Sequence, residues 1–174
     1  MSLTKKDKEE ITKIVVDTIT AMQLGAKAIE EGNRNFELEQ LGKKWKDNGI
    51  KSESTGLIIA PEDVEIDGET EFTWDEAMAL EKEGKIPEGW RLPTRHEWAM
   101  IIEEFGQDDN GAIDGDKLEN SLTLDKYGYY WSSTVSGSSS YYLHFGSSSA
   151  NTYAYNRTSG FSVRCVFGSE KEKK

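Results

Sequence analysis

Charged residues disappear from one stretch near the C-terminal end of the chain, and this stretch constrains the fold more than any other. Residues 127–163 contain no Asp, Glu or Lys, and Arg157 is their only permanent charge. Ser, Tyr, Gly and Asn fill the stretch instead, for example SGSSSYY at 136–142. A flexible linker can have this composition, so the spacing of the aromatic residues has to decide between a linker and a folded sheet.

That spacing follows the period of a β-strand. In residues 142–145 the sequence is Tyr-Leu-His-Phe, and Asn151, Tyr153 and Tyr155 alternate with smaller residues. A period of two is typical of strands with one buried and one exposed face. Tyr, Ser, Gly and Asn are also the residues that recognition surfaces use, because Tyr gives contact area at low entropic cost. The stretch therefore predicts a folded, ligand-facing sheet.

The N-terminal region is predicted to be helical. Residues 5–31 carry apolar or small side chains at steps of three and four, with Thr4 as a candidate N-cap and Gly32-Asn33 as the expected end. The repeating positions are Ile11, Val15, Thr18, Met22, Ala26 and Ile29. Two interpretations stay open: a helix that packs on its own domain, and a helix that associates with a partner or with other copies.

The middle of the chain predicts short elements. We expect a buried strand at 56–60, a hairpin around Asp67-Gly68, and a polar loop at 106–119. Two helices should begin with capping boxes, in which Thr73 pairs with Glu76 and Thr94 pairs with Glu97. Core side chains are expected at Phe36, Leu38, Leu41 and Trp45.

Charge and cysteine content argue against several classes of function. The net charge of −11 disfavours binding to nucleic acids and to anionic membranes. We expect no membrane-spanning helix, since no apolar run approaches about 20 residues, and no secretory signal at residues 1–10. Cys165 is the only cysteine, so neither an internal disulfide nor a cysteine zinc cluster can form.

Four motifs follow one another within residues 56–167: FTWDEAM at 72–78, GWRLPT at 89–94 with Glu97-Trp98, YYWSST at 129–134 and GFSVRCV at 160–166. This series resembles C-type-lectin-fold domains of the formylglycine-generating-enzyme-like, or Fibrobacter succinogenes major paralogous domain-like, group. Within the group it looks most like the variable proteins of diversity-generating retroelements. The resemblance implies an α+β C-type lectin fold, which we place at 37–168. The helical pattern before it predicts a helical extension at 1–36, and the charged residues after it predict a charged tail at 169–174.

In such variable proteins a reverse transcriptase copies a template with errors at adenines, and AAC codons for Asn can become Ser, Tyr, Thr, His, Gly or Asp codons. The Ser, Tyr, His, Gly and Asn residues of 138–159 are what this process would leave. The resemblance thus implies a ligand-binding variable region at about 130–167. Its candidate exposed positions are Ser138, Ser140, Tyr142, His144, Ser147, Ser148, Ser149, Asn151, Tyr153, Tyr155 and Asn156. The expected scaffold beneath them is Leu143, Phe145, Phe161, Val163 and Cys165, with Trp90 in the core and Arg91 buttressing a loop.

Catalytic and metal-binding interpretations are weaker. The related oxidase uses cysteine chemistry, but Cys165 has no second cysteine and no adjacent His, so we expect a buried structural thiol, no catalytic residues and no cofactor. His96 and His144 do not have the spacing of a metal-ligand pair. The acidic loop at 108–116 lacks the first and last carboxylates of an EF-hand, so a solvated loop is favoured over a calcium site.

The resemblance implies a non-enzymatic receptor-type protein that binds a protein or cell-surface receptor, in a phage, another virus or a prokaryotic surface display system. Localisation stays open. Two alternatives remain: an adhesion or structural lectin-fold module that is not diversified, and a degenerate relative of the formylglycine-generating oxidase.

Overall fold

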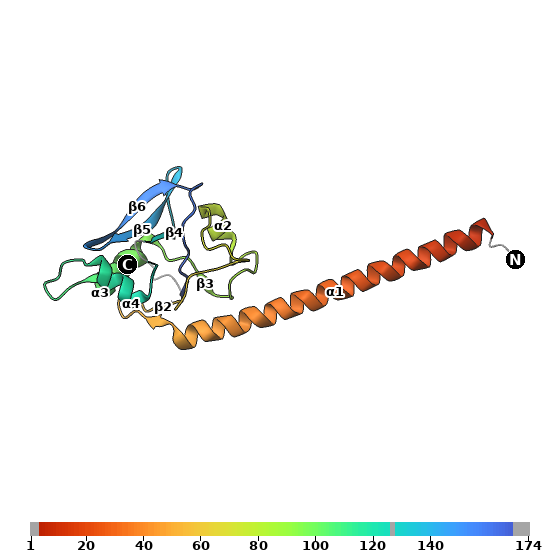
Figure 1. Ribbon diagram of the computed structural model, residues 1–174, viewed down its shortest axis with the longest axis horizontal. Helices are drawn as coiled ribbons and strands as arrows, with labels where there is room; N and C mark the ends of the chain where they lie inside the picture. Colours follow the sequence, from red (N-terminus) through yellow and green to blue (C-terminus); the bar gives the residue numbers. More distant parts are fainter. Residues whose placement is uncertain (1–3, 126–127, 169–174) are drawn as a thin grey trace. The chain divides into compact units, whose positions relative to one another are not determined.

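The computed structural model describes residues 4–125 and 128–168, and it has an α+β fold (Figure 1). Its contacts divide the chain into two compact units, Met1–Glu37 and Leu38–Lys174. The expected charged tail at 169–174 and Tyr127, the first residue of the uncharged stretch, lie outside the described residues.

Helix α1 spans Lys5–Asn48 and passes from the first unit into the second. Thr4 caps it as predicted, because the Thr4 hydroxyl accepts a hydrogen bond of 3.2 Å from the Asp7 amide. The predicted end at Gly32-Asn33 is wrong. A glycine inside a helix costs only about 1 kcal/mol relative to alanine, and the residues that follow, FELEQLGKKWK, are mostly good helix formers.

The last turns of α1 belong to the core of the second unit. Trp45 is buried and meets Trp90 edge to face, with 5.1 Å between ring centroids. Leu41 packs against the same cluster, and Leu38 is half-buried. Phe36, which was expected in the core, is exposed, because it lies in the preceding unit.

The second unit contains two antiparallel sheets. The first has the strand order β1-β2-β7-β3, with bounds Ile50–Lys51, Ile58–Ile59, Val166–Phe167 and Trp90–Arg91. It joins the beginning and the end of the domain, because Ile59 pairs with Val166. The second sheet is a meander of three eight-residue strands, β4 (Tyr129–Ser136), β5 (Ser139–Gly146) and β6 (Ser149–Asn156).

Local turn and cap signals are confirmed. Helices α2 (Trp74–Ala79) and α3 (Arg95–Gly106) both begin with the predicted capping boxes. The Asp67-Gly68 hairpin turn is also present, with positive φ at both residues and paired backbone hydrogen bonds between Ile66 and Glu69.

The polar segment expected as a loop contains an additional helix, α4 (Gly115–Leu122). The Asp114 side chain caps it by accepting a hydrogen bond from the Lys117 amide. Leu118 and Leu122 are its buried residues, and they pack into the same core cluster as Trp98 and Ile101 of α3. The loop expectation was therefore wrong for residues 115–119.

Two apolar clusters hold the domain together. One contains Trp45, Trp90 and Trp131, and the other lies between α3, α4 and the inner face of the β4-β5-β6 sheet. Leu143 and Phe145 belong to the second cluster, whereas Val163 and Cys165 belong to the first. All four are fully buried, as expected of the scaffold, and Phe161 is half-buried against the first cluster.

Candidate functional site

The outer face of the β4-β5-β6 sheet gathers aromatic side chains from all three strands. The register sets Tyr142 opposite both Trp131 and Tyr153, and it sets His144 opposite both Tyr129 and Asn151. Residues that are paired across antiparallel strands point to the same side of the sheet. We call the resulting surface the aromatic face and define it as Tyr129, Tyr142, His144, Tyr153, Tyr155 and the adjacent Phe161.

The rings of the aromatic face contact one another. Tyr129 stacks on His144 at 4.7 Å and on Phe161 at 5.3 Å between ring centroids. Tyr142 lies 4.8 Å from Phe161 and 6.2 Å from Tyr153. Such pairs contribute about 0.5–1.5 kcal/mol each beyond area burial. The face is therefore a preorganised surface rather than a set of independent side chains.

The outermost tyrosines remain open to solvent. Tyr129, Tyr153 and Tyr155 are 44%, 48% and 53% exposed, whereas Tyr142 and His144 are half-buried between them. Burial raises the pKa of Tyr142 above its ordinary value of 10, so its phenol stays protonated at neutral pH. The face thus offers apolar ring area together with neutral hydroxyl groups.

Most of the sequence-predicted positions lie on or beside this face. Those with exposed side chains are Ser138, Ser147, Ser148, Ser149, Asn151, Tyr153, Tyr155 and Asn156. Asn156 follows the face's last tyrosine on the opposite side of β6, and its side-chain oxygen accepts hydrogen bonds from Thr158 that shape the next turn.

Ser140 is the exception, because the expectation that it is exposed is wrong. The residue is fully buried, although it alternates with Tyr142 on the same side of β5. Arg157 covers it: the Arg157 Nε donates a 3.0 Å hydrogen bond to the Ser140 hydroxyl, and its guanidinium lies over the Trp74 ring at 4.4 Å. Trp74 is in turn fixed by a 2.8 Å hydrogen bond to the Ser132 carbonyl.

The hairpin tip between β5 and β6 is seated on α4. A Cβ atom on Gly115 would lie 1.7 Å from the carbonyl oxygen of Gly146, so only glycine permits this approach. Ser147, Ser148 and Ser149 sit at this tip. Helix α4 therefore positions the backbone of these three candidate residues, and none of their side chains belongs to that helix.

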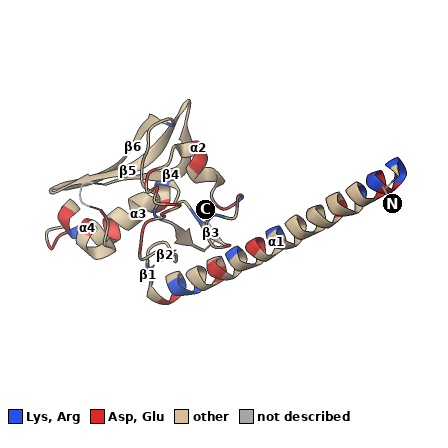
Figure 2. Ribbon diagram, turned by 45° about the vertical axis from the view of Figure 1, so that its right-hand side comes forward, with Lys and Arg blue, Asp and Glu red and all other residues tan. Residues whose placement is uncertain are grey.

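The sheet is uncharged while the surrounding elements are charged. Strands β4, β5 and β6 contain no Lys, Arg, Asp or Glu, and Figure 2 draws them in tan, whereas α2 and α4 carry coloured charged residues. A ligand that binds this sheet would be held by ring contacts and neutral hydrogen bonds.

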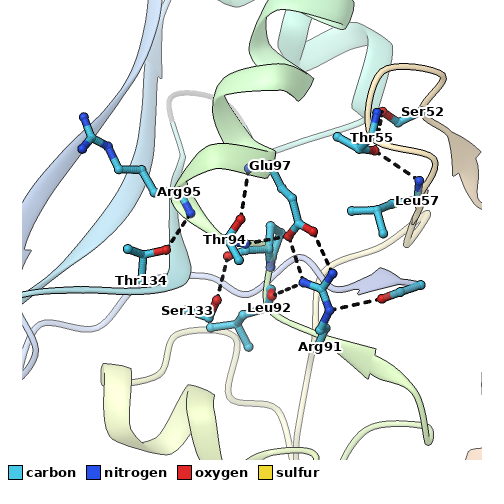
Figure 3. Close-up of polar contacts among 12 residues, drawn as sticks. Ser52, Thr55, Leu57, Arg91, Leu92, Thr94, Arg95, Glu97, Ser133 and Thr134 are labelled. Atoms are coloured by element: carbon cyan, nitrogen blue, oxygen red, sulfur yellow. Dashed lines mark hydrogen bonds and ion pairs between the residues drawn. The ribbon is translucent and has the colours of Figure 1, made fainter. Parts of the chain in front are cut away.

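A polar network ties the GWRLPT segment to the sheet (Figure 3). Arg91 donates two hydrogen bonds, of 2.7 and 2.8 Å, to the Glu97 carboxylate. It also donates hydrogen bonds to the carbonyls of Leu92 and Gly168. The predicted buttress is confirmed, as is the burial of Trp90. Burial alone would raise the pKa of Glu97, but hydrogen bonds from Arg91 and Thr94 more than offset it and lower that pKa.

The same segment contacts β4 directly. The amide of Arg95 donates a 2.9 Å hydrogen bond to the Thr134 hydroxyl, and the Ser133 amide donates one of 2.8 Å to the Pro93 carbonyl (Figure 3). The first strand of the aromatic face is therefore attached to a charged anchor at the start of α3.

A buried cation, Arg164, also supports the inner face of the sheet. Arg164 is 1% exposed and donates to the Asp63 carboxylate and to the carbonyls of Ala60, Leu122 and Thr123. Tyr130, on the inner face of β4, donates its hydroxyl to the same Asp63 at 2.9 Å. Sequence reasoning did not assign this role. Its signal was an arginine inside the otherwise apolar Val163–Val166 stretch.

The residues that catalysis or metal binding would need do not converge. Cys165 is fully buried, and desolvation raises the pKa of its thiol to about 12, so the reactive thiolate is scarce at neutral pH. His96 is exposed at the start of α3, whereas His144 lies in the aromatic face. Within residues 4–125 and 128–168, no group of three His, Cys, Asp or Glu could hold a metal ion.

The acidic loop uses its carboxylates for local structure. Asp108 accepts hydrogen bonds from the amides of Asn110 and Ala112, which lowers the pKa of Asp108, and Asp114 caps α4. These contacts are those of a solvated turn. Across the described part of the chain, no helix is both long and apolar enough to cross a membrane.

Comparison with curated proteins finds no match. A family model does match, over residues 40–167, and it describes the Lcl C-terminal domain. The matched segment contains both sheets, helices α2 to α4 and every residue of the aromatic face. The chain therefore belongs to the Lcl C-terminal domain family and carries its C-type lectin fold behind an N-terminal helical extension.

Proposed function

We propose that this protein binds a macromolecular ligand through the aromatic face and the adjoining hairpin tip, without catalysing a reaction. The observation that carries the proposal is the separation of buried and exposed side chains onto opposite sides of β5 and β6. Leu143 and Phe145 are fully buried, while the neighbouring Tyr153 and Tyr155 stand exposed on the opposite side of the sheet. Outward side chains can be exchanged on such a sheet while the core stays unchanged.

The chemistry of the face favours a protein or a protein-bearing receptor as ligand. Tyrosines supply broad, amphipathic contact area, and serine and asparagine supply adaptable hydrogen bonds. The sheet carries no charge, so steering by opposite charge would contribute little to association. Ring contacts near the centre of the face, around Tyr142 and Tyr153, are the expected source of most binding energy.

We further propose that the face is diversified by a retroelement through adenine-directed mutagenesis. The support is compositional: eight candidate positions with exposed side chains are all Ser, Tyr or Asn, which single-base changes at adenines can interconvert with Asn. Ser140 is removed from the candidate set because Arg157 buries it. Tyr142 and His144 remain candidates, although they are half-buried.

The main alternative is an adhesion or structural module with the same fold and an invariant surface. It predicts that the ring contacts of the aromatic face are indispensable for one fixed partner. The diversified module instead predicts tolerance, because diversification would exchange each exposed residue between copies. A degenerate oxidase is disfavoured by the buried Cys165 thiol with its raised pKa.

A display library tests the proposal. One library would randomise the eight exposed positions, and a matched library would randomise eight exposed positions of α3, α4 and the 108–112 loop. Both would be selected against immobilised streptavidin as a protein probe. We expect folded, specific binders from the first library at a clearly higher frequency. Equal frequencies, or loss of folding in most clones of the first library, would contradict the proposed role of the face.

A further inference from the structure

The first unit carries an apolar stripe along one side of α1 that nothing in the described chain covers. Its large members, including Ile11, Val15, Met22, Ile29 and Phe36, are between 47% and 69% exposed. With 3.6 residues per turn they share one side of the helix with smaller neighbours. We call this set the apolar stripe and define it as Ile11, Val15, Thr18, Ile19, Met22, Ala26, Ile29, Asn33 and Phe36.

Charge is arranged around the stripe. Between residues 11 and 36, every Lys, Arg, Asp and Glu lies outside it on the helical wheel, including Lys27 and Glu31, which form an i,i+4 ion pair. A solvated helix would need no such segregation. The pattern matches a helix whose one side is buried against other helices.

The low helix propensity of this segment indicates that the apolar stripe needs a packing partner. Eight of the ten residues from 11 to 20 are β-branched, and Gly25 and Gly32 follow, each costing about 1 kcal/mol relative to alanine. Exposed i,i+4 ion pairs such as Lys5–Glu9 return only about 0.3–0.5 kcal/mol. An isolated helix with this sequence would be marginal in water, so packing of the stripe has to supply the missing stability.

We infer that the apolar stripe packs against the same stripe of other copies of this chain, in a parallel, in-register coiled coil. The residues fit a heptad in which Val15, Met22, Ile29 and Phe36 take the d positions and Ile19, Ala26 and Asn33 take the a positions. In a parallel bundle Asn33 meets Asn33 of each copy, so the one amide of the stripe finds a hydrogen-bonding partner. In an antiparallel pair it would meet the apolar beginning of the partner's stripe.

The size of the stripe favours more than two copies. From Ile11 to Phe36 it extends about 40 Å, and at a helix width of about 10 Å it offers about 400 Å² per chain. A pair would then bury about 800 Å² in total, below the 1,200 Å² or so of a stable interface. In a three-helix bundle each helix contacts two neighbours, so each apolar stripe is covered from two sides and more of its area is buried.

Self-association would place several aromatic faces on one particle, so weak binding at each would add up through avidity. The inference does not depend on the proposed function. It rests on the sequence and exposure of α1 alone.

Met22 and Leu24 provide a matched pair for the test. Their side chains are 69% and 64% exposed, but Leu24 lies on the far side of the helix from the stripe. Sedimentation of the full chain should give a particle mass of more than twice the 19.6 kDa of one chain. Met22→Asp should reduce it to the monomer, and Leu24→Asp should leave it unchanged. A monomeric wild-type chain, or equal effects of the two substitutions, would overturn the inference.

Orientation needs its own measurement. Ile29→Cys places one accessible thiol on the stripe, because the native Cys165 is buried. Oxidation should give disulfide-linked dimers if the helices run parallel and in register, since identical residues then face each other. In an antiparallel bundle the two thiols would be about 15 Å or more apart along the axis, so an oligomer that does not cross-link would overturn the parallel arrangement.

Discussion

The Ser140 hydroxyl accepts a 3.0 Å hydrogen bond from the Arg157 Nε, and this contact closes one end of the aromatic face. Arg157 also donates to the carbonyls of Gly137 and Ser139 and lies over the Trp74 ring. The only cation of the 127–163 stretch is thus used to hold the β4-β5 turn. It marks the boundary between the proposed ligand-binding surface and the buried scaffold.

Ser140→Tyr should destabilise the domain, because the larger side chain has no space and Arg157 loses its acceptor. We expect a loss of about 1–3 kcal/mol in the free energy of unfolding, measured by urea titration. Ser138→Tyr, two residues earlier in an exposed turn position, is the control and should change it by less than about 0.5 kcal/mol. Equal losses of unfolding free energy for the two substitutions would show that position 140 accepts a larger side chain as readily as position 138.

Gly115→Ala should displace the hairpin tip from α4, since the new methyl group would overlap the Gly146 carbonyl. The expected cost is about 3 kcal/mol, at the upper end of overpacking effects. Gly146→Ala tests the same contact from the other side, where a Cβ would meet open space. That substitution should be near neutral. If Gly115→Ala left the stability unchanged, the hairpin tip would not be in contact with α4.

Glu97→Gln should weaken the anchor beneath β4, because Arg91 loses the carboxylate that accepts its two hydrogen bonds. We expect a loss of about 2–4 kcal/mol, discounted for the partial exposure of Arg91. Glu76, the matching member of the exposed α2 capping box, is the control, and Glu76→Gln should cost much less.

The lowered pKa of Glu97 also predicts a dependence on pH. The unfolded chain has the ordinary value of 4.5, so at low pH the unfolded state binds the proton more readily than the folded state. The stabilisation is fully present above pH 4.5 and is lost as pH falls through the folded-state pKa. Chemical unfolding between pH 3 and pH 7 should show this loss in the wild type, and a smaller slope in Glu97→Gln.

Cys165 should behave as a structural thiol. We expect it to resist a thiol reagent in the folded protein and to react once urea unfolds the chain, because it is fully buried and its pKa is raised. Cys165→Ala should leave ligand selection from the display library intact, with a modest loss of stability. Rapid labelling of the folded protein would instead support residual oxidase-like chemistry.

Features that depend on neighbouring residues could be predicted from the sequence. The capping boxes at Thr73 and Thr94 need only a glutamate three residues later, and the Asp67-Gly68 turn needs only its two residues. The alternation around Leu143 also identified the buried and exposed sides of β5. Tyr129 could have been added to the face, since it alternates with the buried Tyr130.

Features that depend on distant residues could not be predicted. Ser140 is buried by Arg157, which lies 17 residues away, and Arg164 finds acceptors at Asp63 and Leu122 in separate segments. Helix α4 has only two apolar anchors, so its periodicity was too weak to distinguish it from a loop. The end of α1 was misplaced because Gly32 is tolerated where its neighbours are good helix formers.

Sequencing codons 130–167 of this gene across its native population is the most direct test of a diversified binding face. The account predicts substitutions concentrated at adenine-containing codons for the exposed positions of the face and the hairpin tip. Ser140, Leu143, Phe145 and Phe161 should stay unchanged, because each supports the structure beneath. A uniform sequence, or changes spread equally over buried and exposed positions, would contradict the account.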